Sequence, residues 1–390
     1  MGGLFPRPLD PPVAIEPLEL VRCVPESDHH CGLVQLRHSC DPRVMYGLDY
    51  GYRSSLNASM VTHLRGIVDG LHARVTLAPG NLVVDIGSND GTTLGFYPRG
   101  EATLLGVDPT AAKFRGYYRD DIAVIENFFS ARLVQKHFPG QKAKIITSIA
   151  MIYDLEEPLR FVREIADLLD DEGVWFFEQS HLPLLLAANA YDTICHEHLE
   201  YYALEQIRYM LERSGLRILS AVTNDVNGGS IAVTACKVES LHATEPGVEL
   251  SLEAERAALL SEPETWARFR HDVETHRDEL RSLVASLRAD GKSVYGYGAS
   301  TKGNVLLQYC GFGPGDLAAI GEVNADKFGC VTPGTAIPII DEKEARARRP
   351  DVFLVLPWHF RDFIVEKERP YLESGGRLLF PLPKVELVGA

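Results

Sequence analysis

The chain has 390 residues, of which 45% are hydrophobic and 24% charged, proportions that are ordinary for a globular protein. Its formal net charge of −15 argues against nucleic acid as a partner, because nonspecific binding to nucleic acid needs a basic surface. No apolar run reaches membrane-spanning length, and seven scattered cysteines fit reduced thiols better than a disulfide framework, so we expect a cytoplasmic protein without a membrane partner. A chain of this length predicts two domains, with room for a small appendage.

The first 56 residues make up the smallest predicted unit. Residues 1–15 are rich in proline and are expected to be irregular. Residues 16–56 contain short strand-like pieces, turn residues and three cysteines, Cys23, Cys31 and Cys40.

A pattern of apolar strands separated by amphipathic helices extends over residues 57–245. Strands are predicted at 82–86, 103–107, 123–125, 144–147 and 174–178, with helices such as 131–138 and 158–169 between them. Strands that are apolar throughout indicate a parallel sheet that is covered on both faces. Two further strands, 218–222 and 230–236, flank the turn Asn227-Gly228-Gly229 and are expected to close the sheet as an antiparallel edge.

The first of these strands leads into a glycine-containing turn that carries acidic side chains. Asp85, Asn89 and Asp90 lie here without a basic residue. Carboxylates would repel a pyrophosphate, whereas they would attract the sulfonium and amino groups of S-adenosylmethionine. Gly87 and Gly91 would let the backbone approach that ligand closely. The turn therefore predicts an S-adenosylmethionine site, with an NAD-type fold as the alternative.

Further cofactor contacts are expected along the same edge of the sheet. Asp108 ends the second strand, about 20 residues beyond the turn, which suits the hydroxyls of a ribose. Glu126 and Asn127 follow the third strand, where they could contact the adenine, and Ser88 of the turn and Ser148 after the fourth strand complete the expected set.

The segment Ile194-Cys195-His196-Glu197-His198-Leu199-Glu200-Tyr201-Tyr202 concentrates groups that transfer protons or bind metals. Burying such groups without partners costs several kcal/mol, which makes a functional role attractive. Histidine has an ordinary pKa of about 6.5 and suits a general base. Alternatively, His-x-His on a strand would point both imidazoles to one face as metal ligands, or both rings could be interior and structural.

The remaining residues, 246–390, predict a second α/β lobe. Residues 250–289 read as one or two charged amphipathic helices that connect the lobes. Strands are predicted at 293–297, 317–321, 336–340, 352–356 and 377–380. After the first, Ser300, Thr301 and Lys302 open a helix, where hydroxyls, a lysine and free backbone amides form an anion site. Later strands of this lobe lead to other candidate substrate residues, namely Glu322, Lys327, Trp358 and His359.

Taken in order, four motifs resemble those of nucleotide-sugar C-methyltransferases, which make branched deoxysugars, typically for antibiotics. They are the Asp85–Gly91 turn, His196-Glu197-His198, Asn227-Gly228-Gly229 and the stretch from Tyr295 to Asn304. The resemblance covers residues 16 to 385 approximately. It implies a class I methyltransferase core, Rossmann-like, plus a C-terminal Rossmann-like α/β lobe that helps to hold the nucleotide sugar. It also implies methylation at C3 of a dTDP-4-keto-hexose, with Asn227 and Asn304 among the residues that bind this substrate.

The resemblance gives roles to the histidine segment. A ketone at C4 acidifies the hydrogen on C3, so the enzyme must supply a base and stabilise an enolate. The resemblance implies that His198 is this base, with His196 and Glu197 as orienting or proton-relay groups. Cys195 stands where many members have a tyrosine. Tyr50 and Tyr52 resemble a second tyrosine-bearing motif that faces the cleft, and they could supply the missing hydroxyl.

The resemblance also implies a zinc-bearing N-terminal segment and leaves other activities open. Cys23 and Cys31 match the second half of the family's zinc site, with an insertion between them. A first Cys-x-x-Cys turn is absent from this sequence, so His29, His30 or Cys40 would have to complete four ligands. A bifunctional enzyme that also reduces the C4 ketone with NADPH, a non-catalytic nucleotide-sugar-binding homologue, and an O- or N-methyltransferase remain as alternatives.

Overall fold

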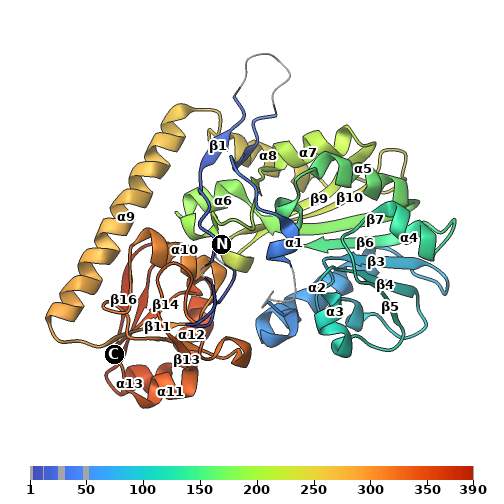
Figure 1. The fold of residues 1–390 in the computed structure, drawn as a ribbon. Coiled ribbons are helices and arrows are strands. Elements are labelled where there is room, and N and C mark those ends of the chain that lie inside the picture. The colour runs from blue at the N-terminus through green and yellow to red at the C-terminus, as the bar shows by residue number, and fades with distance from the viewer. Residues whose placement is uncertain (1–2, 12, 25–30, 47–51, 390) are drawn as a thin grey trace.

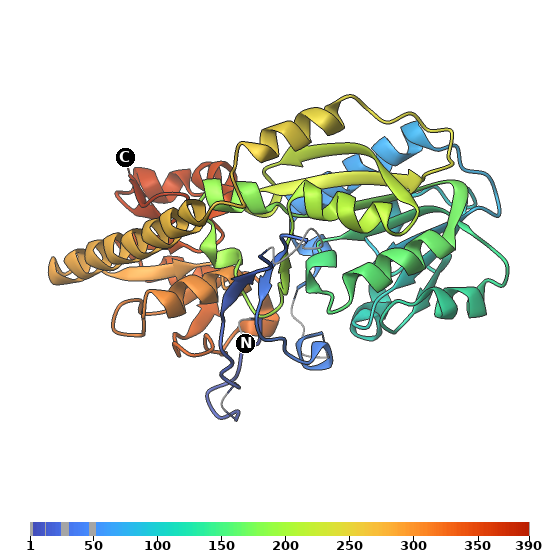
Figure 2. The same cartoon turned by 90° about the horizontal axis from the view of Figure 1, so that it is seen from above.

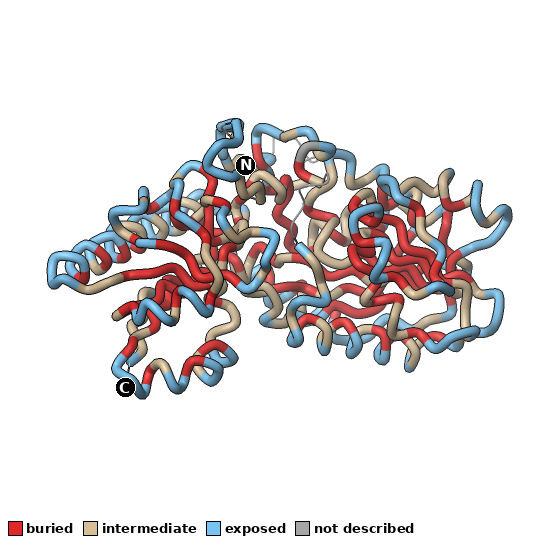
Figure 3. Tube along the Cα trace, turned by 60° about the horizontal axis from the view of Figure 1, so that its bottom comes forward, coloured by how far each residue is buried: buried red, intermediate tan, exposed pale blue. Residues whose placement is uncertain are grey.

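The computed structural model describes residues 3–11, 13–24, 31–46 and 52–389, which form two α/β lobes (Figure 1). The strands of both sheets are the most deeply buried parts of the chain (Figure 3). The predicted α/β class is confirmed.

The first lobe is built on a seven-stranded sheet with the order β5-β4-β3-β6-β7-β10-β9. Its strands are β3 (Leu82–Ile86), β4 (Thr103–Val107), β5 (Ile122–Ile125), β6 (Ala143–Ile149), β7 (Leu169–Ser180), β9 (Leu216–Asn224) and β10 (Ser230–Lys237). Strands β3 to β7 run parallel, and β10 runs antiparallel to both β7 and β9. The predicted antiparallel edge is therefore confirmed, with β10 lying inside β9.

Helices cover both faces of this sheet, as the uniformly apolar strands predict. One face packs against α4 (Ala131–His137), α5 (Pro158–Leu168), α7 (Leu204–Glu212) and α8 (Gly247–Arg256). The other packs against α2 (Ala58–Arg74) and α3 (Ala111–Phe114). Because helices cover both faces of the sheet, only the strand ends are open to a ligand.

The second lobe has a six-stranded sheet with the order β13-β12-β11-β14-β15-β16. The strands are β11 (Val294–Tyr297), β12 (Ile320–Glu322), β13 (Ile339–Asp341), β14 (Val352–Val355), β15 (Arg377–Phe380) and β16 (Glu386–Val388). All are parallel except β16, which pairs antiparallel with β15 and was not predicted. The expected strand at 336–340 begins late, at Ile339, because Pro338 has no N–H to donate to a ladder.

Around the second sheet lie α10 (Thr301–Tyr309), α11 (Glu342–Ala347), α12 (Arg361–Lys367) and α13 (Arg369–Glu373). The connecting segment, predicted as one or two helices over residues 250–289, forms two helices. Helix α8 packs on β9 of the first lobe, whereas the long α9 (Pro263–Ala289) lies along the outside of the second (Figures 1 and 2). Buried Leu280, Val284 and Leu287 attach α9 to the core of the second lobe.

The N-terminal residues lie between the two lobes (Figure 2). Strands β1 (Leu20–Arg22) and β2 (Val34–Leu36) form a small antiparallel sheet with β8 (Glu200–Tyr201), and α1 (Pro42–Met45) follows. Because β8 comes directly after the histidine segment, this sheet ties the N-terminal residues to the candidate site. Among the described residues, no helix is both long enough and apolar enough to cross a membrane.

Candidate active site

The turn after β3 has the backbone that its glycines predict. Gly87 and Gly91 both have φ of +74°, and Asn89 between them has φ of +50°, in the left-handed region where Gly and Asn are the favoured residues. A Cβ at Gly91 would lie 2.6 Å from the ring of Tyr118, so no larger residue fits there. The turn is therefore compact, with the ring of Tyr118 packed against Gly91.

The acidic residues at this edge are buried and hydrogen-bonded. Asp85 accepts a hydrogen bond of 2.5 Å from Thr147 Oγ1, and burial raises the pKa of its carboxyl to about 7. Asp108 accepts from the backbone N–H of Asn89 at 2.8 Å and of Thr110 at 2.6 Å. The two carboxyl groups thus lie at the ends of neighbouring strands, as predicted, and they also fix the shape of the turn.

A segment from the N-terminal side closes over the same turn. The backbone N–H of Ser54 donates to Asn89 Oδ1 at 2.9 Å, and that of Ser55 donates to Asp90 Oδ2 at 3.1 Å. Asn89 Nδ2 in turn donates to the carbonyl of Tyr52 at 3.1 Å, while Tyr52 itself is 48% exposed. Tyr50 lies outside the described residues. The main chain of this tyrosine motif therefore reaches the cofactor turn.

The other predicted cofactor residues differ in accessibility. Ser88 Oγ is joined to the Tyr118 hydroxyl by a hydrogen bond of 2.8 Å, and Glu126 and Asn127 are exposed directly after β5. Ser148 is fully buried, and its Oγ accepts from Trp175 Nε1 at 2.7 Å. The hydroxyl of Ser148 is thus engaged within the fold and is not exposed to a ligand.

The histidine segment forms a turn, not the strand that a paired His-x-His ligand set would need. The backbone N–H of His198 donates to the carbonyl of Cys195 at 3.1 Å. His196 Nε2 donates to the carbonyl of Glu16 at 3.0 Å, whereas His198 Nδ1 donates to that of Thr193 at 2.8 Å. The alternative in which both imidazoles point to one face of a strand as metal ligands does not fit this turn, in which each ring is held by a different backbone carbonyl.

His198 has the surroundings of a neutral imidazole. Its ring lies 4.2 Å from that of Tyr153, centroid to centroid. Burial, assisted by the positive charge of Lys302, lowers the pKa of His198 to about 3. Since Nδ1 carries the proton that Thr193 accepts, Nε2 holds the free lone pair.

The thiol of the segment is buried, and its carboxylate is partly buried. Cys195 is 1% exposed, and burial with the nearby Glu197 raises the pKa of its thiol well above the usual range. Glu197 Oε2 is buried without a hydrogen-bond partner in the described part of the chain. Gly3 packs against Glu197 and Thr301, which brings the N-terminal residues to the space between the lobes.

The predicted anion site of the second lobe faces the first lobe. Ser300 Oγ caps α10 by accepting from the N–H of Gly303 at 3.0 Å. Lys302 Nζ donates to the carbonyl of Asn227 at 2.6 Å, so the lysine reaches the turn between β9 and β10. Lys327 Nζ donates to the carbonyl of Ala299 at 2.8 Å. Burial lowers the pKa of both lysines.

Other predicted substrate residues lie in the turns and helices around this anion site. Glu322 Oε2 accepts from the backbone N–H of Ala299 at 2.7 Å and so shapes the turn after β11. Asn304 is buried in α10. His359 follows Trp358 in the 3-10 turn η8 (Trp358–Phe360), and burial lowers its pKa to about 3.

Three residues at this junction escaped sequence analysis: Tyr153, Asp192 and Thr193. Asp192 Oδ2 accepts from Trp358 Nε1 at 2.7 Å across the two lobes. The sequence offered one signal for Asp192. It is the first acidic residue after the apolar stretch that begins at Leu182, and it lies just before the histidine segment.

The N-terminal cysteines do not form a complete metal site in the part of the chain that the structure describes. Cys23 is exposed, and the neighbouring Cys31 lowers the pKa of its thiol. Across residues 3–11, 13–24, 31–46 and 52–389, no three His, Cys, Asp or Glu side chains are arranged to hold a metal ion. His29 and His30, named above as further ligands, lie outside the described residues.

Comparison with known proteins gives matches to both lobes. Residues 60–221 match a family described as a methyltransferase domain, and residues 225–383 match the C-methyltransferase C-terminal domain. The chain is 35% identical to C-methyltransferase NovU of Streptomyces niveus over 379 residues, which are 96% of this chain and 88% of NovU. Among solved structures, the magnesium protoporphyrin IX methyltransferase ChlM of Synechocystis matches 45% of this chain and 79% of its own, with a TM-score of 0.35 at 16% identity. An S-adenosylmethionine-dependent methyltransferase from Mesorhizobium loti matches 43% of this chain and 95% of its own, with a TM-score of 0.34 at 16% identity.

Proposed function

Because this chain belongs to the C-methyltransferase family, we propose that it methylates C3 of a dTDP-4-keto-hexose, such as a 2,6-dideoxy sugar, in antibiotic deoxysugar biosynthesis. The chain is an enzyme with the α/β fold of class I S-adenosylmethionine-dependent methyltransferases. The observation that carries the finer proposal is the tautomer of His198, whose Nδ1 proton is committed to Thr193 and whose Nε2 is free.

S-adenosylmethionine, when bound, supplies a methyl group on a positively charged sulfur. The residues at the end of the first sheet fit this group, because Asp85, Asp90 and Asp108 make the edge acidic. We assign the ribose hydroxyls to Asp108, which directly follows β4, and the left-handed glycines would let the backbone approach the amino acid part.

The base must remove a proton from C3, which the C4 ketone acidifies. We assign this step to His198 Nε2, which is neutral because burial and Lys302 oppose the imidazolium. A diphosphate bound beside Lys302 would offset that positive charge. The basicity of His198 would then rise when the nucleotide sugar binds.

The second lobe is assigned the nucleotide sugar. Free backbone amides at the start of α10, the hydroxyl of Thr301 and the cations of Lys302 and Lys327 form a site that suits a diphosphate. Each lysine gives one N–H of its ammonium group to a backbone carbonyl, Lys302 to Asn227 and Lys327 to Ala299, and an ammonium has three N–H donors, so donors remain for an anionic ligand. No step of the proposal passes through zinc, because the described residues lack a complete ligand set.

The experiment is incubation with S-adenosylmethionine and a dTDP-4-keto-deoxyhexose that carries deuterium at C3, followed by mass spectrometry of the product. Gain of one methyl group with loss of deuterium is expected. Gain of a methyl group with deuterium retained would mean methylation of oxygen or nitrogen, and it would refute the enolate route.

A further inference from the structure

Asp192 is a buried carboxylate at the junction of the two lobes that the steps above do not use. It lies in the 3-10 turn η5 (Tyr191–Thr193) and is 1% exposed. One oxygen, Oδ2, accepts from Trp358 Nε1 at 2.7 Å. The other, Oδ1, has no hydrogen-bond partner among the described residues. A carboxylate is costly to bury in this way, so its retention needs a reason.

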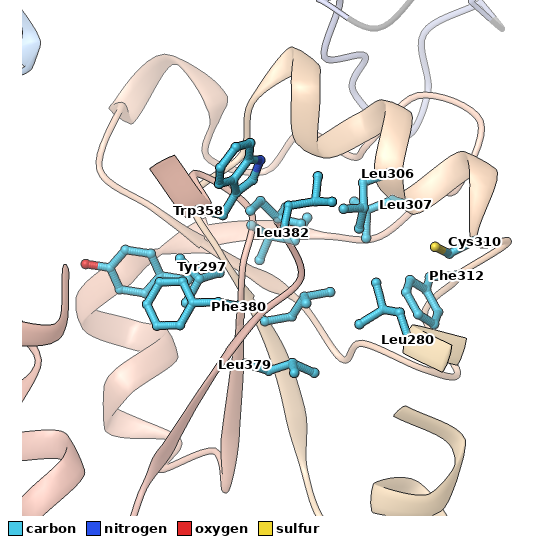
Figure 4. Close-up of a cluster of buried hydrophobic side chains, with 14 of the residues drawn as sticks. Leu280, Tyr297, Leu306, Leu307, Cys310, Phe312, Trp358, Leu379, Phe380 and Leu382 are labelled. Carbon is cyan, nitrogen blue, oxygen red and sulfur yellow. The ribbon is translucent and has the colours of Figure 1, made fainter. Parts of the chain in front are cut away.

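The Trp358 side of this contact belongs to the second lobe. Trp358 lies at the edge of the apolar cluster that includes Tyr297, Leu306 and Phe380 (Figure 4). A Cβ added at Gly228 would lie 3.0 Å from its indole ring. The indole is thus fixed between the second lobe and the β9–β10 turn, and Asp192 fixes its one donor.

The other side of the contact leads to the proposed base. Thr193, the residue after Asp192, presents the carbonyl that accepts from His198 Nδ1. The turn that carries both is closed by the backbone N–H of Thr193 donating to Ala190 at 3.1 Å. A movement of Asp192 would therefore move the carbonyl that sets the tautomer of His198.

Asp192 also acts on Lys302 through charge. Cys195 and His198 from the histidine segment, His359 from η8 and Asp192 from η5 are the titratable groups that interact with this lysine. Burial lowers the pKa of Lys302, and the carboxylate of Asp192 opposes this effect. Lys302 in turn holds the carbonyl of Asn227.

We propose that Asp192 is a positioning residue that locks Trp358 of the second lobe to the turn that orients His198, so that a nucleotide sugar held by one lobe meets the base of the other. This inference rests on the proposed function for its kinetic readouts, and its structural readouts stand without it.

The structural test uses nuclear magnetic resonance on the full chain without substrate. The chain has three tryptophans, so W358F assigns the indole N–H of Trp358, and H198N assigns the ring nitrogens of His198. In D192A we expect both the Trp358 indole signal and the His198 ring signals to shift. The control is D362N, whose carboxylate is 97% exposed near η8, and it should leave both unchanged. Unchanged His198 signals in D192A, with the indole signal shifted, would overturn the link.

The kinetic test compares D192A, W358F and the double variant. We expect each single variant to lower kcat at least tenfold with S-adenosylmethionine affinity changed less than twofold, and the double variant to be no worse than the singles, because both remove one contact. In D192N the amide oxygen still accepts from Trp358, but Lys302 loses its compensating charge, so the alkaline limb of kcat should move to lower pH. Additive losses, or a kcat within twofold of the parent in D192A, would refute the proposal. Loss of all methyl transfer by the parent chain would instead refute the proposed function and leave the resonance test to decide.

Discussion

His198 donates its Nδ1 proton to the carbonyl of Thr193, five residues earlier, at a distance of 2.8 Å. A backbone carbonyl only accepts, so this contact fixes which ring nitrogen carries the proton. The neighbouring histidine, His196, is held by a carbonyl too, but that carbonyl belongs to Glu16 of the N-terminal segment. These two histidines, separated by one residue, are therefore held by different segments of the chain.

Replacing His198 by Asn should abolish turnover while S-adenosylmethionine still binds. The amide of Asn can keep the hydrogen bond to Thr193, but it has no basic nitrogen, and loss of a general base costs about 10²–10⁴-fold in rate. Single-turnover assays and calorimetric titration of the cofactor measure the two quantities. H137N is the control and should retain the activity, because the ring of His137 is exposed on α4 and likewise bonds a backbone carbonyl, that of Leu133 at 2.9 Å. Near-normal turnover in H198N would remove His198 from the role of base.

Replacing Asp108 by Asn should weaken the binding of S-adenosylmethionine by about tenfold or more, since hydrogen bonds to a charged group contribute roughly 1.5–3 kcal/mol. Asp108 also accepts from two backbone N–H groups, so the variant should lower the melting temperature as well. Titration calorimetry compares it with D120N, whose carboxylate is 83% exposed and pairs with Arg99 on the surface. An unchanged affinity in D108N would mean that the ribose lies elsewhere.

Local patterns predicted much of this molecule. The apolar run 82–86 and the acidic turn behind it predicted a strand and a cofactor turn, because both depend on neighbours in sequence. The orientation of His196 and His198 was not predictable in the same way. It depends on carbonyls of Glu16 and Thr193, and the first of these is 180 residues away.

The contact between Asp192 and Trp358 could not be predicted from the sequence for a related reason. The two residues are 166 positions apart, and their hydrogen bond exists only because the lobes pack together. Neither residue belongs to a spacing pattern that points to the other. The late start of β13 is different, because Pro338 was visible in the sequence and its missing N–H should have shortened the predicted strand.

Replacing Gly91 by Ala should destabilise the protein more than the same change at Gly100. Both glycines have positive φ, +74° and +77°, so both variants carry a backbone strain of about 1–2 kcal/mol. At Gly91 the new Cβ would also meet the ring of Tyr118, whereas at Gly100 nothing lies within 4 Å. Urea denaturation should therefore show a larger loss for G91A. Equal losses would mean that Tyr118 moves aside freely.

The affinity for S-adenosylmethionine should rise with pH through neutrality. Burial raises the pKa of Asp85 to about 7, so the carboxyl is mostly neutral at pH 6 and mostly ionised at pH 8. The ionised form attracts the cofactor's positive charge, and the fraction ionised grows about tenfold over this range. The sign for stability is opposite: the folded state binds this proton more tightly than the unfolded state, so Asp85 favours folding as the pH falls from 7 towards 4. Titration calorimetry at pH 6, 7 and 8 measures the affinity, and D85N, which cannot ionise, should bind more weakly but with little dependence on pH. A D85N variant with the same pH dependence as the parent would assign the effect to another group.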